Sequence, residues 1–166
     1  AWSLATILWG VSEAPILMMP AVSLQLLASL IGCLGFGILF NIHGPGMLLC
    51  ALGGVISWAA FCLSAHLGAN EIMSSFIAAI IAALYSETMA RIRKYPAISY
   101  LTVSIFPMLP GAGIYYTSNY LVQGNMQAFS EKGLTTVGIA GVLAVGILLV
   151  STLVRLWTVW KQRKHL

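Results

Sequence analysis

The sequence predicts an all-α integral membrane protein with about five transmembrane helices. The 166 residues are 60% hydrophobic and only 7% charged, whereas a soluble domain carries roughly 25% charged residues. Five stretches each contain the run of about 20 mostly apolar residues that a membrane-spanning helix needs. The connections between them are short and contain Gly or Pro, so consecutive helices are expected to be antiparallel neighbours.

The predicted spans follow in order along the chain, at about residues 16–40, 46–67, 71–91, 96–122 and 133–160. The last is long enough to tilt or to emerge from the membrane. Residues 15–166 are therefore interpreted as a single five-helix transmembrane domain. Residues 1–14 are apolar but too short to span, and we interpret them as an interfacial segment or the tail of an upstream element.

The basic residues predict the orientation, because Lys and Arg are kept on the cytoplasmic side. With five crossings, only Lys132 falls on one side, and the rest fall on the other: Arg91, Arg93, Lys94, Arg155, Lys161, Arg163 and Lys164. The N-terminus is thus predicted outside and the C-terminus inside, in a multi-pass protein of the plasma or inner membrane. Charges at helix ends favour contact with the lipid bilayer rather than with nucleic acid.

The fourth span contains two prolines three residues apart, Pro107 and Pro110, followed by Gly111 and Gly113. Proline lacks a backbone N–H and clashes with the carbonyl four residues back. An unsatisfied backbone group costs several kcal/mol in hydrocarbon, so such a break persists only inside protein or beside a water-filled cavity. We therefore predict that the fourth helix is broken at this Pro-x-x-Pro-Gly motif and that the break lines a polar cavity.

The second half of the broken helix would begin near Pro110, and its positive dipole end would attract an anion such as a carboxylate. Just beyond it lie Tyr115, Tyr116 and Asn119 in an unusually polar run. Discontinuous helices of this kind bind substrates in many secondary transporters. These three side chains, together with Pro107, Pro110, Gly111 and Gly113, are the predicted substrate-binding residues.

Glu87 is the acidic residue best placed to lie within a span. It precedes Arg91 by four residues, so the two share a helix face. An interfacial Glu–Arg pair and a proton-coupling carboxylate both remain open, since ionisable groups in membranes usually serve transport. The second interpretation predicts a proton-coupled antiporter.

Signatures of enzymes, cofactors and metal sites are missing. The chain lacks Asp and shows no HExxH, no GxSxG and no Gly-rich phosphate loop followed by Lys. Its three cysteines form no CxxC pair and have no His at metal-ligand spacing. We therefore expect neither an enzyme nor a cofactor or metal site.

Three segments resemble the threonine/serine exporter family, specifically its small five-helix half: Phe40-Asn41, Cys50-Ala51-Leu52-Gly53-Gly54 and Phe106-Pro107-Met108-Leu109-Pro110-Gly111. The similarity covers about residues 16–155. It implies that Pro107, Pro110 and Gly111 belong to a functional element and that Asn41 faces the same cavity. In this family the small half is fused behind a larger half or is a separate YjjB-like subunit paired with it.

The resemblance implies export of threonine or serine, or, in split pairs, of a dicarboxylate such as succinate. A Lys or Arg deep in the membrane would favour a dicarboxylate. None is evident, so the amino acid is preferred unless the partner supplies the cation. A non-transporting structural or regulatory subunit is the third hypothesis. The expected partner is the larger companion half, inserted with opposite topology as in inverted repeats, or a homo-oligomer.

Overall fold

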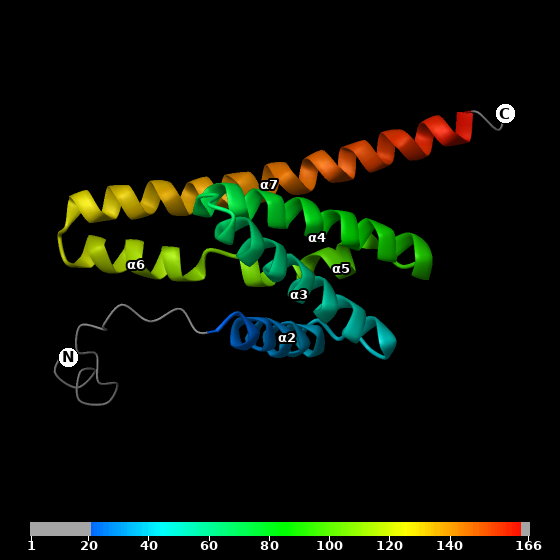
Figure 1. Cartoon of the computed structure of the whole chain (residues 1–166), viewed down its shortest axis with the longest axis horizontal. Coiled ribbons are helices and arrows are strands. Elements are labelled where there is room, and N and C mark those ends of the chain that lie inside the picture. Colours follow the sequence, from blue (N-terminus) through cyan, green and yellow to red (C-terminus); the bar gives the residue numbers. More distant parts are fainter. Residues whose placement is uncertain (1–20, 164–166) are drawn as a thin grey trace.

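The computed structural model describes residues 21–163, and all regular structure in that part is helical (Figure 1). The elements in chain order are α2 (Val22–Leu39), α3 (Pro45–His66), α4 (Glu71–Arg93), α5 (Ala97–Ser104), the 3₁₀ turn η1 (Phe106–Met108), α6 (Gly111–Val122) and α7 (Met126–Arg163). The segment 1–14 and the beginning of the first predicted span lie outside the described residues.

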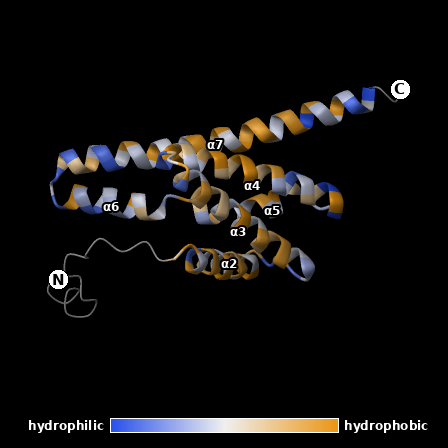
Figure 2. Cartoon of the chain, in the orientation of Figure 1, coloured by the Kyte–Doolittle hydropathy of each residue, from blue (hydrophilic) through white to orange (hydrophobic). Residues whose placement is uncertain are grey.

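Four helices, α2, α3, α4 and α7, are long and apolar enough to cross a membrane, and the bent pair α5–α6 makes a fifth if it is one span. This confirms the predicted class for residues 21–163, which are all-helical and contain four, or with the bent pair five, segments able to span a membrane. Figure 2 shows apolar residues along α2 to α5 and the middle of α7, whereas α6 and the first turns of α7 are more hydrophilic. The α6–α7 hairpin also extends past the turn between α3 and α4 (Figure 1).

Local signals in the sequence set the helix ends. Pro45 occupies the first turn of α3, where its missing N–H costs nothing. The Asn70 side chain caps α4 by accepting a hydrogen bond from the Met73 N–H at 2.8 Å. α7 begins seven residues before the predicted start near 133. Asn125 accepts from the Ala128 N–H at 3.1 Å, and the polar residues that follow continue the helix.

Helix α4 is the centre of the packing and contacts α3, α5 and α7. Its buried residues are all serine or alanine: Ser74, Ser75, Ala78, Ala79, Ala82, Ala83 and Ser86. Small side chains let helix backbones approach closely, which drives association where lipid gives no hydrophobic gain. A Cβ at Gly146 of α7 would lie 3.0 Å from the Ala79 Cβ and 3.4 Å from the Phe76 carbonyl oxygen.

Two adjacent glycines of α3, Gly53 and Gly54, let this helix approach its neighbours closely. A Cβ at Gly53 would overlap Ser104 Oγ of α5 and lie 2.7 Å from the Tyr85 ring of α4. A Cβ at Gly54 would overlap Cys33 Sγ of α2. Helix α3 therefore joins α2, α4 and α5 at one level of the bundle, just before the chain reaches η1.

Candidate functional site

The prolines interrupt the helical chain between α5 and α6. Helix α5 ends at Ser104, η1 contains Pro107, and Leu109 is extended with φ −63° and ψ 129°. Pro110 then precedes the first residue of α6. The segments before and after the break are bent by 49° relative to each other. Proline has no N–H to continue the ladder of hydrogen bonds, so the chain changes direction here.

The carbonyls near the break have found other donors. The Met108 N–H donates to the Ile105 carbonyl at 2.9 Å, and the Leu109 N–H donates to the Phe106 carbonyl at 3.2 Å. Both are the shorter i→i+3 bonds of a 3₁₀ turn. Pro107 has no N–H to donate to the Val103 carbonyl. This carbonyl instead lies 3.5 Å from the thiol of Cys33.

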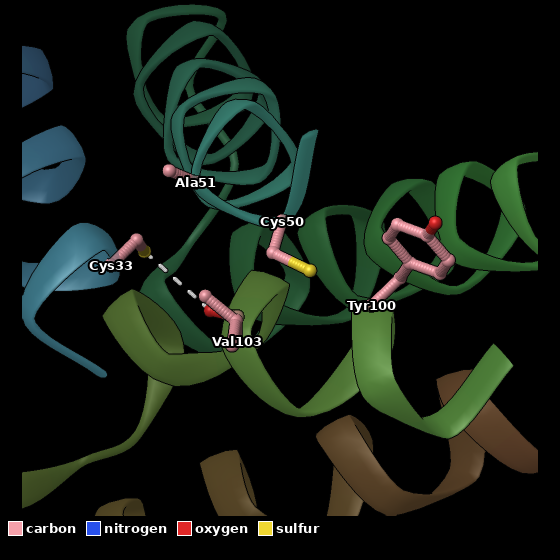
Figure 3. Packing of buried hydrophobic residues seen from close by; sticks show 5 residues of the cluster. All are labelled: Cys33, Cys50, Ala51, Tyr100 and Val103. Atoms are coloured by element: carbon pink, nitrogen blue, oxygen red, sulfur yellow. Dashed lines mark hydrogen bonds between the residues drawn. The ribbon is translucent and has the colours of Figure 1, made fainter. Parts of the chain in front are cut away.

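Figure 3 shows how the thiols of α2 and α3 meet α5. The Cys33 thiol is directed at the Val103 carbonyl, and the Cys50 thiol donates to the Ser99 carbonyl at 3.7 Å. Both cysteines are buried, together with Ala51, Tyr100 and Val103. A thiol is a weak donor, so these two cysteines combine apolar packing with partial satisfaction of the α5 backbone.

A cavity of about 240 Å³ lies beside the break. Its walls come from four parts of the chain: Trp58 and Phe61 of α3, Glu71 and Ser75 of α4, Pro107–Pro110 with Ala112 and Gly113, and Lys132, Thr135, Thr136 and Ile139 of α7. Because Glu71 is the first residue of α4, the cavity lies beside the first turns of that helix, near one end of the span.

The cavity has an aromatic wall from α3 and polar groups from α4 and α7. The rings of Trp58 and Phe61 stack with centroids 5.0 Å apart. The polar part of the lining consists of two buried residues, Ser75 and Thr136, and two charged residues, Glu71 and Lys132. A concave site with apolar walls and a few convergent polar groups is the usual form of a small-molecule site.

The cavity contains three of the predicted substrate-binding residues, Pro107, Pro110 and Gly113. Gly111 is the first residue of α6 but does not line the cavity. A Cβ at Gly113 would lie 3.2 Å and 3.3 Å from two Thr136 side-chain carbons. Glycine at this position therefore lets the first turn of α6 approach α7.

The other predicted residues lie elsewhere. Tyr115 and Tyr116 follow on α6, largely exposed, with their rings edge to face at 5.5 Å. Asn119 is half-buried further along α6. Asn41 is exposed in the turn after α2, where its φ of 57° is left-handed, a conformation that Asn tolerates. None of these four lines the cavity, and their roles in binding remain predictions.

Glu87 lies sixteen residues after Glu71 on α4, about 24 Å along a helix that rises 1.5 Å per residue. Its carboxylate is 3.6 Å from the Arg91 guanidinium, and the Glu87 side chain is 22% exposed. Arg91 also donates to Thr158 Oγ1 of α7 at 3.3 Å. The pair therefore joins α4 and α7 at the end of the bundle opposite the cavity.

Sequence reasoning missed the polar side of the cavity. Glu71 was identifiable only as a charge at a helix N-terminus, and Lys132 only as the isolated basic residue on its side of the membrane. One signal was available: Lys132, Thr135 and Thr136 are spaced i, i+3, i+4 and so share a helix face. Among residues 21–163, no group of His, Cys, Asp or Glu is arranged to hold a metal ion.

Comparison with known proteins agrees with the family resemblance. No solved structure matches the chain. The family model described as Threonine/Serine exporter, ThrE, matches residues 25–153, which include α3 to α6 and most of α2 and α7. With the long apolar helices, this indicates a multi-pass membrane transporter. The chain belongs to the threonine/serine exporter family, ThrE.

Proposed function

We propose that the chain is the small half of a secondary active exporter that moves threonine or serine across the plasma or inner membrane in exchange for protons. The observation that carries this proposal is the cavity at the helix break, lined by Pro107, Pro110 and Gly113 together with both charged residues. Its volume of about 240 Å³ is below the roughly 300–1,000 Å³ of pockets that hold drug-sized ligands. A small metabolite fits such a space.

The proposed orientation gives this cavity a place in export. Arg91 and Arg93 end α4 and Lys161 and Arg163 end α7, so the positive-inside rule assigns these ends to the cytoplasm. The opposite end of α4, where Glu71 lines the cavity, then faces outward. A substrate in the cavity would be on the release side of the transporter.

The dicarboxylate alternative is favoured by one specific observation. Lys132 lines the cavity and provides a cation for a substrate carboxylate, although near one end of the span rather than deep in the membrane, where the sequence analysis looked for the cation of a dicarboxylate exporter. Glu71 lines the same cavity and would repel a second carboxylate. The two charges together favour the amino acid, with a subunit of a succinate exporter as the second candidate.

The proposal includes a partner, either the larger companion half or a second copy of the chain. No residue of α6 is buried, and Ile114, Tyr115 and Val122 are each more than half exposed. Alternating access usually moves one repeat against another around a shared site. A companion packed on this face would complete the cavity and provide the moving part.

Transport is expected to need the pair. A monomer of the chain, purified in mild detergent and placed in liposomes, should give no threonine efflux above empty liposomes, and assembly with the companion half or with a second copy should restore it. Mass measurement of each preparation identifies the assembly. A monomer of this chain that transports by itself would contradict the prediction.

The helix break is expected to be required for efflux. Replacing both Pro107 and Pro110 with Ala restores two backbone donors and should straighten α5–α6, lowering the rate of threonine efflux at least about tenfold. Pro45→Ala is the matched control, because that proline stands at a helix start where it breaks nothing. Efflux by the double variant equal to that of the wild type, at equal amounts of folded protein, would refute this role.

Glu87 is expected to carry the proton-coupling step. Glu87→Gln should reduce efflux driven by a pH gradient while threonine exchange at equal pH on both sides continues. Arg91→Gln is the control, because it breaks the same ion pair and leaves the carboxylate in place. If both variants respond to the pH gradient like the wild type, Glu87 has only a structural role.

A further inference from the structure

The cavity contains two opposite charges from distant parts of the chain. Glu71 stands at the start of α4 and Lys132 in the second turn of α7. Within residues 21–163 the ion pair found is that of Arg91 with Glu87, so Glu71 and Lys132 are not joined to each other. Glu71 is exposed and Lys132 is half-buried, so both charges are accessible to a ligand that enters the cavity. A ligand with both charges would compensate the two at once.

We propose that this pair forms a zwitterion site, in which Lys132 binds the α-carboxylate and Glu71 binds the α-ammonium group of a small amino acid. The proposal rests on the proposed function and names the residues that select the substrate. It adds Glu71 and Lys132 to the substrate-binding residues predicted from the sequence. It also sets the direction in which the substrate lies between α7 and α4.

The carboxylate end is formed by Lys132 and the start of α6. Gly113 packs against Thr136, which lies one helical turn after Lys132, so the first turn of α6 is close to the Lys132 side chain. No side chain caps α6. The Gly111 N–H donates to the Leu109 carbonyl at 2.7 Å, and the N–H groups of Ala112 and Gly113 have no acceptor within the helix. Those N–H groups, the positive end of the helix and the Lys132 ammonium all favour an anion.

The ammonium end is formed by oxygen atoms. Ser75 Oγ of α4 donates its proton to the Glu71 carbonyl at 2.8 Å. A hydroxyl that has given its proton to the backbone still has lone pairs to accept with. The Ser75 oxygen and the Glu71 carboxylate suit the donors of an ammonium group.

The remaining wall limits the side chain of the ligand. Trp58 and Phe61 stack on each other, and the Trp58 indole N–H donates to Gln25 Oε1 at 3.2 Å, which fixes the ring. In a cavity of about 240 Å³, this aromatic wall leaves room for a side chain of a few atoms. The site therefore favours small amino acids over bulky ones, and over dicarboxylates, whose second carboxylate would face Glu71.

The test measures competition against radiolabelled L-threonine exchange by the wild-type chain reconstituted with its companion half. L-Threoninamide lacks the carboxylate, N-acetyl-L-threonine lacks the ammonium group, and succinate carries two carboxylates. Each is expected to compete about 10- to 100-fold less well than L-threonine, the usual effect of losing a hydrogen bond to a charged group. Because this part uses the wild-type protein, a variant that fails to fold cannot obscure it.

Two variants assign the ends of the site. Glu71→Gln should weaken competition by L-threonine about 10- to 100-fold and remove the penalty against N-acetyl-L-threonine. Lys132→Gln should weaken competition by L-threonine by a similar factor and remove the penalty against L-threoninamide. Glu131→Gln is the matched control, since that acid neighbours Lys132 but does not line the cavity, and it should behave as the wild type.

The outcomes separate this inference from the proposed function. Threonine exchange in which N-acetyl-L-threonine or succinate competes as well as L-threonine would overturn the zwitterion site and leave the exporter in place. Unchanged selectivity in both Glu71→Gln and Lys132→Gln would do the same. Absence of exchange of either threonine or succinate by the wild-type pair would instead overturn the proposed function.

Discussion

The structure depends on one constraint, the need to satisfy backbone hydrogen bonds around two prolines in an apolar helix. Pro107 and Pro110 remove two donors from the ladder, and in hydrocarbon each orphaned carbonyl would cost several kcal/mol. The 3₁₀ bonds of η1 satisfy the carbonyls of Ile105 and Phe106. The thiol of Cys33 lies 3.5 Å from the Val103 carbonyl and partly satisfies it. The bend of 49° follows, and the cavity occupies the space beside it.

Close packing through small residues holds this break in place. The buried residues of α4 are serine and alanine, and Gly53 and Gly54 bring α3 against α5 and α2. The cavity then forms where this tight packing ends, at the first turns of α4, and α6 leaves the bundle to pack on α7. Rigid helices thereby position polar groups from α4 and α7 around a segment that is itself irregular.

The sequence was sufficient for the all-helical class and for the place of the bend between α5 and α6, because hydropathy and proline act locally along the chain. The start of α7 was predicted seven residues too late. The sequence was insufficient for the cavity, because its charged wall depends on which helices become neighbours. Glu71 and Lys132 are 61 positions apart, and neither is unusual for a helix end. Tyr115, Tyr116 and Asn119 were selected by their polarity after the break, yet the bend directs α6 away from the cavity.

We propose that the break at Pro107 and Pro110 borders a water-filled site that opens outward and binds the substrate. The most direct test of this account is the reactivity of Ala112→Cys, a residue of the cavity wall, in a chain whose three native cysteines are replaced by serine. With the companion half in oriented membranes, an impermeant maleimide added outside should label this cysteine, and L-threonine should protect it. Gly141→Cys, at an exposed position of α7 with open space around it, should face lipid and stay unlabelled. An Ala112→Cys variant as unreactive as Gly141→Cys would contradict the account.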